Sequence, residues 1–283
     1  MAPMRLLVIG AAGMLGQDLL AAADGAGHEP VGWDLPEVDI TDAAALHDAV
    51  AALRPDAIIN CAAWTDVDGA EEHEARATEI NGAGAGNVAA AATAAGALVV
   101  QLSTDYSFDG TASAPYTESS PVSALGAYGR SKLAGEIAVA GAGGDFAIVR
   151  SAWLFGAHGK NFVDTMLRLG AERDEVAVVD DQVGCPTYTG HLARALVEIA
   201  ERRLTGVMHA AGAGACSWYD LAVAAFERTG TECTVRRQST EQLGRPAPRP
   251  AYSVLQTERD DTPRLPAWQD GLAAHLAARR AIA

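Results

Sequence analysis

The chain has 283 residues, of which 49% are hydrophobic and 20% are charged. That composition supplies a large apolar core, so it excludes a disordered chain and a mini-protein that depends on disulfides. The 21 basic and 36 acidic residues give a formal net charge of −15, which argues against nonspecific binding to nucleic acid or to an anionic membrane. The N-terminus lacks a signal-peptide pattern and the four cysteines are widely spaced, so we expect reduced thiols and a cytoplasmic protein.

Short β-branched runs alternate with alanine-rich helical segments through the first half of the chain, a pattern typical of a parallel sheet covered on both faces. Strands are expected at Leu6–Ile9, Pro30–Trp33, Ala57–Asn60, Leu98–Ser103, Phe146–Arg150 and Gly206–Ala211. Helices are expected at 14–23, 42–53, 71–94 and 127–140. Right-handed crossovers between those strands would give an α/β fold, a doubly wound parallel sheet of the Rossmann type.

The alternation weakens after about Ser151, where glycine, proline and aromatic residues become frequent. This change in pattern indicates a second, smaller domain at the C-terminal side. We expect a dinucleotide-binding domain over 1–151 with return segments near 183–215, and a substrate domain over 152–182 and 216–283.

A glycine-rich turn follows the first expected strand directly and precedes a helix. Glycines in that position let the backbone approach a pyrophosphate at the positive end of the helix. The spacing is G-x-x-G-x-x-G and not the common G-x-G-x-x-G, so the prediction depends on the position after the strand. The expected cofactor contacts of this turn are Gly10, Ala12, Gly13, Met14, Leu15 and Gly16.

Asp34 ends the second expected strand, close to the offset of ~20 residues at which an acidic side chain binds the adenine ribose. A carboxylate there accepts a hydrogen bond from the 2′-hydroxyl and repels a 2′-phosphate, so it favours NADH over NADPH. The alternative is a solvated acid at the end of a strand. Asp39 and Ile40, at the next turn, are placed to flank the adenine.

The most specific pattern is Tyr128-Gly-Arg-Ser-Lys132, which places a phenol and an ammonium group on one face of an expected helix. Lys132 is one of only two lysines in the chain. A cation beside a phenol lowers its pKa from ~10, so Tyr128 is a candidate proton donor to a carbonyl group. Thr104 follows the strand that ends at Ser103, where its hydroxyl could hold the same oxygen. The alternative is a surface Tyr–Lys pair.

Longer strings around these residues carry a family resemblance. They are Asn60-Cys-Ala-Ala-Trp-Thr-Asp-Val-Asp-Gly-Ala-Glu71, Ser103-Thr-Asp-Tyr-Ser-Phe-Asp-Gly110, Tyr128-Gly-Arg-Ser-Lys-Leu-Ala-Gly-Glu136, Arg150-Ser-Ala-Trp-Leu-Phe-Gly156 and Asp181-Gln-Val-Gly-Cys-Pro-Thr187. In this order, over about residues 5 to 275, they resemble the dTDP-4-dehydrorhamnose reductases, a family of extended short-chain dehydrogenases. The resemblance implies a dTDP-sugar substrate, reduction of its C4 keto group and use of NADPH or NADH, with Asp34 tilting the choice toward NADH.

The resemblance also implies roles for individual residues. Thr104, Tyr128 and Lys132 form the implied catalytic set, in which Tyr128 protonates the C4 oxygen and Lys132 bonds the nicotinamide ribose. The further implied contacts are Cys61, Ala62 and Ala63 with the cofactor, and Val67, Asp105, Trp153, Asn161 and Arg249 with the nucleotide sugar. An indole offers a flat apolar face to a deoxysugar, and an arginine offers a planar fork to a diphosphate.

No metal site is expected, because the seven histidines show no metal-ligand spacing and are expected on the surface. Some relatives of this family hold a metal at a dimer contact, but no acidic cluster in the sequence supports one here, and a homodimer stays open. Two other functions also stay open: reduction of another dTDP-4-keto-6-deoxysugar, and a non-catalytic regulatory subunit of the same fold. Retention of Thr104, Tyr128 and Lys132 favours an enzyme.

Overall fold

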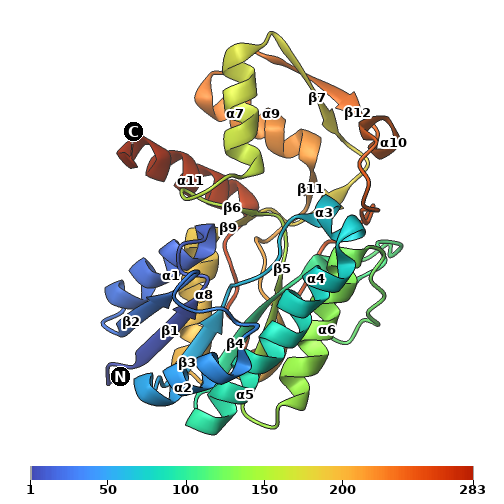
Figure 1. Cartoon of the computed structure of the whole chain (residues 1–283). Coiled ribbons are helices and arrows are strands. Elements are labelled where there is room, and N and C mark those ends of the chain that lie inside the picture. The colour runs from blue at the N-terminus through green and yellow to red at the C-terminus, as the bar shows by residue number, and fades with distance from the viewer. Residues whose placement is uncertain (1, 283) are drawn as a thin grey trace.

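The computed structural model describes residues 2–282, and it describes the side chains of residues 2–280. The main lobe contains one six-stranded sheet in the order β10-β5-β4-β3-β1-β2, with every neighbouring pair parallel. Its strands are β1 (Arg5–Ile9), β2 (Glu29–Trp33), β3 (Ala57–Asn60), β4 (Leu98–Thr104), β5 (Phe146–Ser151) and β10 (Gly206–His209). The predicted Rossmann-type α/β fold and its six strands are confirmed (Figure 1).

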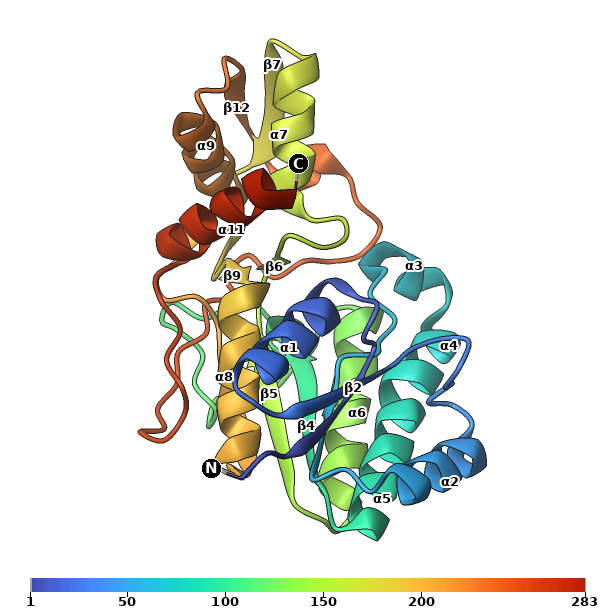
Figure 2. The same ribbon diagram turned by 90° about the vertical axis from the view of Figure 1, so that its left-hand side faces the viewer.

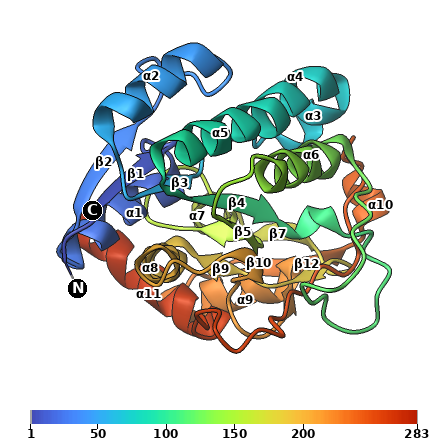
Figure 3. The same cartoon turned by 90° about the horizontal axis from the view of Figure 1, so that it is seen from below.

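Helices cover both faces of this sheet. Their bounds are α1 (Met14–Gly25), α2 (Ala43–Leu53), α5 (Ala85–Ala95), α6 (Ala127–Gly141) and α8 (Thr189–Glu201). Figure 3 shows α1 and α8 on one face, and α2, α5 and α6 on the other. Because neither face meets water, the central strands are apolar on both sides, and Leu6, Leu7 and Val8 of β1 are all fully buried.

The helix predicted over 71–94 is confirmed as one continuous helical run from Glu74 to Ala95, but it contains a π-helical turn, and residues before His73 belong to a separate helix. The chain there forms α3 (Val67–Glu72), α4 (Glu74–Thr78), a π-helical turn η1 (Glu79–Gly84) and α5. Within the π-helical turn, the Asn81 amide accepts from the Trp64 N–H at 2.8 Å and donates to the Ser131 hydroxyl at 2.9 Å. These contacts to other segments stabilise the widened turn, and local helix propensity does not reveal them.

A smaller lobe lies over the carboxyl edge of the sheet (Figure 1 and Figure 2). It contains α7 (Phe162–Glu172), β7 (Glu175–Val179), α9 (Trp218–Thr229), β12 (Thr234–Gln238), α10 (Thr240–Leu243) and α11 (Trp268–Ile282). Strands β7 and β12 pair in parallel, and the lobe has its own apolar core around Phe226 and Leu272. Between the lobes, β6 (Leu154–Phe155) pairs with β9 (Thr187–Tyr188), and β8 (Val183–Gly184) pairs with β11 (Cys216–Ser217). Among residues 2–282, no helix has the length and apolar character needed to cross a membrane.

Three histidines are buried, so the expectation that all seven lie on the surface is wrong. His28 Nε2 lies 2.9 Å from Glu201, and His275 Nε2 lies 3.1 Å from Asp164. The His209 ring bonds backbone carbonyls instead. Burial of an imidazole requires such partners, and all of them lie far away in the sequence. In the described part of the chain, no group of three or more His, Cys, Asp or Glu side chains is arranged to hold a metal ion.

Candidate active site

A cleft of about 870 Å³ opens at the carboxyl edge of the sheet. The strand order reverses between β1 and β3, and ligands of open α/β sheets bind where the order reverses. The volume lies within the range of roughly 300–1,000 Å³ that small-molecule sites occupy. One end of the cleft is lined by the β1–α1 turn, and Trp153 and Trp218 line another part of it.

The cleft brings together most of the residues that the sequence predicted. They are Gly10, Ala12, Gly13, Met14, Leu15, Gly16, Asp34, Asp39, Ile40, Cys61, Ala62, Ala63, Val67, Thr104, Asp105, Tyr128, Lys132 and Trp153. Asn161 and Arg249 do not line it. Asn161 caps α7 by accepting from the Asp164 N–H at 3.0 Å, and it donates to the Gly156 carbonyl at 2.9 Å. Its side chain is therefore occupied in holding the start of the helix.

The β1–α1 turn has no room for a side chain at Gly10 or at Gly16. Gly10 has a φ of +81°, and a Cβ there would lie 2.7 Å from the backbone nitrogen of Ala62. A Cβ at Gly16 would collide with the carbonyl oxygen of Gly10. The bare backbone at the N-terminus of α1 fits the pyrophosphate of a dinucleotide cofactor, because N–H groups and the positive helix end face it.

Asp34 directly follows β2 and ties the end of this strand to the turn. One carboxylate oxygen accepts from the Ala12 N–H at 2.8 Å, and the other accepts from the Leu35 N–H at 2.8 Å. The carboxylate is thereby fixed beside the turn, with further lone pairs available to a ribose hydroxyl.

The loop after β2 and the helix α4 line the neighbouring part of the cleft, where Arg76 is a residue that the sequence did not single out. Asp39 accepts from the Thr41 N–H at 2.8 Å, and this bond holds the pKa of Asp39 below its usual value. Arg76 of α4 also lines this part and pairs with Glu79 at 2.7 Å. Asp39 thus stabilises its own loop as well as lining the cleft.

Tyr128 and Lys132 lie one turn apart on α6, across from the end of β4. The Thr104 hydroxyl hydrogen bonds the Tyr128 phenol, and it also lies 3.1 Å from a carboxylate oxygen of Asp105. The Lys132 ammonium group is buried and donates to the Leu102 carbonyl at 2.7 Å. A phenol, a hydroxyl and an ammonium group therefore meet in one part of the cleft.

The predicted lowering of the Tyr128 pKa by Lys132 is wrong in the free protein. Burial raises the pKa of Tyr128 to about 12, and the negative charge of Asp105 adds to this effect. Burial also lowers the pKa of Lys132 to about 8, against the attraction of Glu136. Tyr128 therefore keeps its proton at neutral pH, while the pKa of Lys132 lies only slightly above neutral pH.

Asp105 is a buried carboxyl group at the wall of the cleft. Its Oδ1 atom accepts from the Thr104 hydroxyl at 3.1 Å, and the Ser253 hydroxyl also hydrogen bonds the carboxyl group. Burial nevertheless raises the pKa of Asp105 to about 6. The Oδ2 atom is fully buried, so the carboxyl group holds Thr104 and does not present a free oxygen to the cleft.

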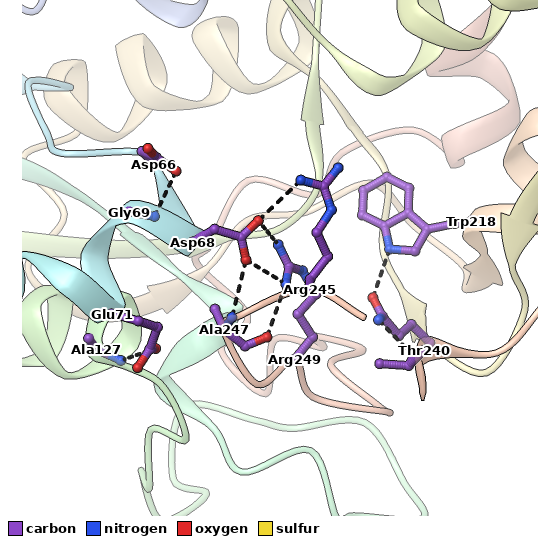
Figure 4. A network of polar contacts seen from close by, with 11 residues as sticks. Asp66, Asp68, Gly69, Glu71, Ala127, Trp218, Thr240, Arg245, Ala247 and Arg249 are labelled. Atoms are coloured by element: carbon purple, nitrogen blue, oxygen red, sulfur yellow. Dashed lines mark hydrogen bonds and ion pairs between the residues drawn. The ribbon is translucent and has the colours of Figure 1, made fainter. Parts of the chain in front are cut away.

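A network at the rim of the cleft holds Arg249 (Figure 4). The two oxygens of Asp68, in α3, each lie 3.0 Å from one terminal nitrogen of Arg249. Asp68 also accepts from the Ala247 N–H at 3.2 Å and from Arg245 at 3.4 Å. Arg249 further hydrogen bonds the Tyr106 phenol, which lines the cleft. The proline-rich segment around Arg249 is thus anchored to α3 beside the cleft.

Trp218 is another cleft residue that the sequence did not single out. It is the first residue of α9 and its indole stacks on that of Trp153, with ring centroids 3.6 Å apart and planes 4° apart. A signal was available in the sequence, because Ser217 and Asp220 form a capping box that marks a helix start at the aromatic residue.

The doubly wound sheet, the glycine-lined first turn, and the tyrosine and lysine one helical turn apart define the class of extended short-chain dehydrogenases. Comparison with known proteins narrows the class. Residues 4–281 match the family model described as RmlD substrate binding domain, so the chain belongs to this family. The resemblance to dTDP-4-dehydrorhamnose reductases is confirmed.

Individual relatives cover nearly the whole chain. A dTDP-4-dehydrorhamnose reductase of Streptomyces griseus is 45% identical over 262 residues, covering 90% of this chain and 86% of that protein. A dTDP-4-keto-6-deoxy-D-glucose reductase of Streptomyces niveus is 44% identical over 253 residues, covering 89% and 88%. The crystal structure of a dTDP-4-dehydrorhamnose reductase from Bacillus anthracis in complex with NADP has a TM-score of 0.95 and 37% identity, covering 97% of this chain and 99% of that one.

Proposed function

We propose that the protein reduces the C4 keto group of dTDP-4-dehydro-L-rhamnose to give dTDP-L-rhamnose, with NADH or NADPH as reductant. The observation that carries the proposal is the meeting of Thr104, Tyr128 and Lys132 in a cleft whose other end is the glycine-lined turn. The activities of the relatives from Streptomyces griseus and Bacillus anthracis support the same reaction. The bound nicotinamide supplies the hydride that reaches C4.

Tyr128 supplies the proton. Its raised pKa keeps the phenol protonated at neutral pH, so it can donate to the C4 oxygen as that oxygen gains negative charge. The Thr104 hydroxyl, already bonded to Tyr128, holds the same oxygen. The Lys132 ammonium group stabilises the phenolate that remains, which then recovers a proton from solvent. Addition of one hydride and one proton to the carbonyl group completes the reduction.

The nucleotide sugar needs a second set of contacts. Asp105 and the edge of the Trp153 ring would contact the sugar from the cleft wall. Arg249, which lies at the rim beside Tyr106 and outside the cleft lining, would reach the diphosphate from there. In this proposal, residues 1–151 and 183–215 hold the coenzyme, while 152–182 and 216–283 hold the nucleotide sugar. We expect the reaction to take place in the cytoplasm, where such coenzymes and nucleotide sugars are available.

A second candidate substrate has specific support. The name of the Streptomyces niveus reductase gives dTDP-4-keto-6-deoxy-D-glucose as its substrate. That protein is 44% identical to this chain, nearly the same as the 45% of the Streptomyces griseus relative. We would measure NADH and NADPH oxidation with both dTDP-4-keto sugars, beside GDP- and UDP-linked 4-keto sugars. Preference for dTDP-4-dehydro-L-rhamnose is the expected result. If the protein oxidises neither NADH nor NADPH with any of these sugars, the result would favour a non-catalytic subunit.

The pH profile tests the role of Lys132. The ammonium group is charged below its pKa of about 8 and neutral above it, so kcat/KM should fall as the pH rises through about 8. Lys132→Arg keeps the charge at all these pH values, so the variant should be slower but should lack this alkaline fall. Steady-state rates across the pH range provide the measurement. The same fall in the Lys132→Arg variant would assign it to another group.

Asp34 is expected to control coenzyme choice. In Asp34→Ala the ribose hydroxyl loses a charged acceptor, and the repulsion of a 2′-phosphate disappears. The ratio of kcat/KM for NADH to that for NADPH should therefore fall roughly 10- to 100-fold. Asp24→Ala, which removes an exposed acid from α1, is the matched control and should leave the ratio unchanged. An unchanged ratio in Asp34→Ala would contradict the assignment.

A further inference from the structure

Three aromatic rings from three separate segments form a stack beside the cleft. Trp218 begins α9, Phe162 begins α7, and Trp153 lies between β5 and β6. The Trp218 and Trp153 rings are 3.6 Å apart and nearly parallel, and the Phe162 and Trp218 rings are 4.6 Å apart with an angle of 51° between their planes. The central ring, Trp218, thus contacts an aromatic ring of each neighbouring segment.

Trp218 is held in place at both its backbone and its side chain. The capping box of Ser217 and Asp220 fixes the first turn of α9. The indole N–H donates to the Gln182 side chain at 3.1 Å, and Gln182 donates in turn to the Thr240 hydroxyl at 2.9 Å. Figure 4 labels Trp218 and Thr240, the two ends of this chain of hydrogen bonds. Trp218 cannot turn without breaking this chain of hydrogen bonds, so it forms a rigid support.

Trp153, in contrast, depends on its neighbours for its conformation. Its φ is +49°, in the left-handed region that a tryptophan rarely adopts. Gly184 packs so closely that a Cβ there would lie 2.5 Å from the indole. With Trp218 covering one face and Gly184 lying over the other, Trp153 has a single orientation, in which the edge of the ring lines the cleft.

We propose that Trp218 is a positioning residue, which holds the Trp153 indole so that the edge of its ring contacts the sugar of the substrate. This inference rests on the proposed function, because it assigns Trp153 to the nucleotide sugar. Trp218 would act on substrate binding and orientation and would leave coenzyme binding unchanged. The Phe162 ring contacts the Trp218 ring, and the Gln182 side chain accepts from the Trp218 N–H, so both residues help to hold Trp218 in place.

The stack itself can be measured without activity. Two parallel indoles in contact couple their electronic transitions, so the circular dichroism of the wild-type protein should show an exciton couplet. Trp153→Phe and Trp218→Phe should each remove the couplet. Trp268→Phe, which alters a buried tryptophan in the core of the same lobe, should retain it. Absence of the couplet in the wild type would overturn the proposal.

Kinetics then test the positioning role. Trp218→Ala should raise KM for the nucleotide sugar about three- to tenfold, the fold-change that corresponds to one aromatic pair, with KM for NADH unchanged. Trp218→Phe keeps a flat ring, so its KM for the nucleotide sugar should lie between those of Trp218→Ala and the wild type. This variant serves as the test if Trp218→Ala does not fold. An unchanged KM for the sugar would overturn the role of Trp218 alone, whereas a wild-type protein that reduces no 4-keto sugar would overturn the proposed function.

Discussion

Replacement of Tyr128 by phenylalanine is expected to lower kcat by roughly 10²- to 10⁴-fold, the usual contribution of a positioned proton donor. The variant loses only the hydroxyl group and keeps the ring that meets Tyr106 edge-on, with centroids 5.7 Å apart. Coenzyme affinity should therefore change little. Steady-state rates with the nucleotide sugar give kcat, and fluorescence titration with NADH gives the affinity.

Tyr106→Phe is the matched control for this variant. Tyr106 also lines the cleft and also has a raised pKa, but its phenol bonds Arg249 at the rim and does not bond Thr104. Its loss should raise KM for the sugar and leave most of kcat. Near-wild-type turnover in Tyr128→Phe would exclude Tyr128 as the proton donor, as would a larger loss of kcat in Tyr106→Phe.

Replacement of Arg150 by methionine is expected to lower the free energy of unfolding by about 3–5 kcal/mol, the typical cost of breaking a buried ion pair. The side chains of Arg150 and Glu136 are only 5% and 8% exposed, and two nitrogens of Arg150 donate to Glu136 at 2.6 and 2.9 Å. Without the guanidinium group, the buried carboxylate would retain only the hydroxyls of Ser103 and Ser107 as hydrogen-bond donors, with the charge of Lys132 nearby. Urea denaturation gives the free energy of unfolding.

Two further variants distinguish the contribution of the buried ion pair to the free energy of unfolding from the effect of simply replacing an arginine. The double variant Glu136→Leu with Arg150→Met removes both charges, and it should recover most of the lost stability. Arg168→Met breaks an exposed pair with Glu172 and should change the unfolding free energy little. Wild-type stability in Arg150→Met would show that the buried pair does not stabilise the fold.

The parts of the fold that could be predicted are those that depend on local pattern. The apolar runs at Leu6–Ile9 and Ala57–Asn60 form strands because both their faces are covered, and that requirement is visible in the residues themselves. The π-helical turn inside the helix predicted over 71–94 was not predictable in this way. It depends on Asn81 bonding Ser131, 50 residues away in the sequence.

The candidate site shows the same division. The helical spacing of Tyr128 and Lys132 predicted that they would lie on one face of α6, but the sequence could not show that Lys132 donates to the Leu102 carbonyl. The role of Asp68 was not predicted because its partner Arg249 is 181 residues away in the sequence. The role of Trp218 was not predicted because it depends on stacking with Trp153, which lies in another segment. Contacts between distant segments thus account for what the sequence did not show.

Transfer of an isotope tests the central claim most directly. The protein would be incubated with dTDP-4-dehydro-L-rhamnose and with NADH that carries deuterium in the transferable position at C4 of the nicotinamide. We predict a product identified as dTDP-L-rhamnose by nuclear magnetic resonance, with deuterium bonded to C4 of the sugar. A product without deuterium at that carbon, or no product although the coenzyme and the sugar both bind, would contradict reduction of the C4 keto group in this cleft.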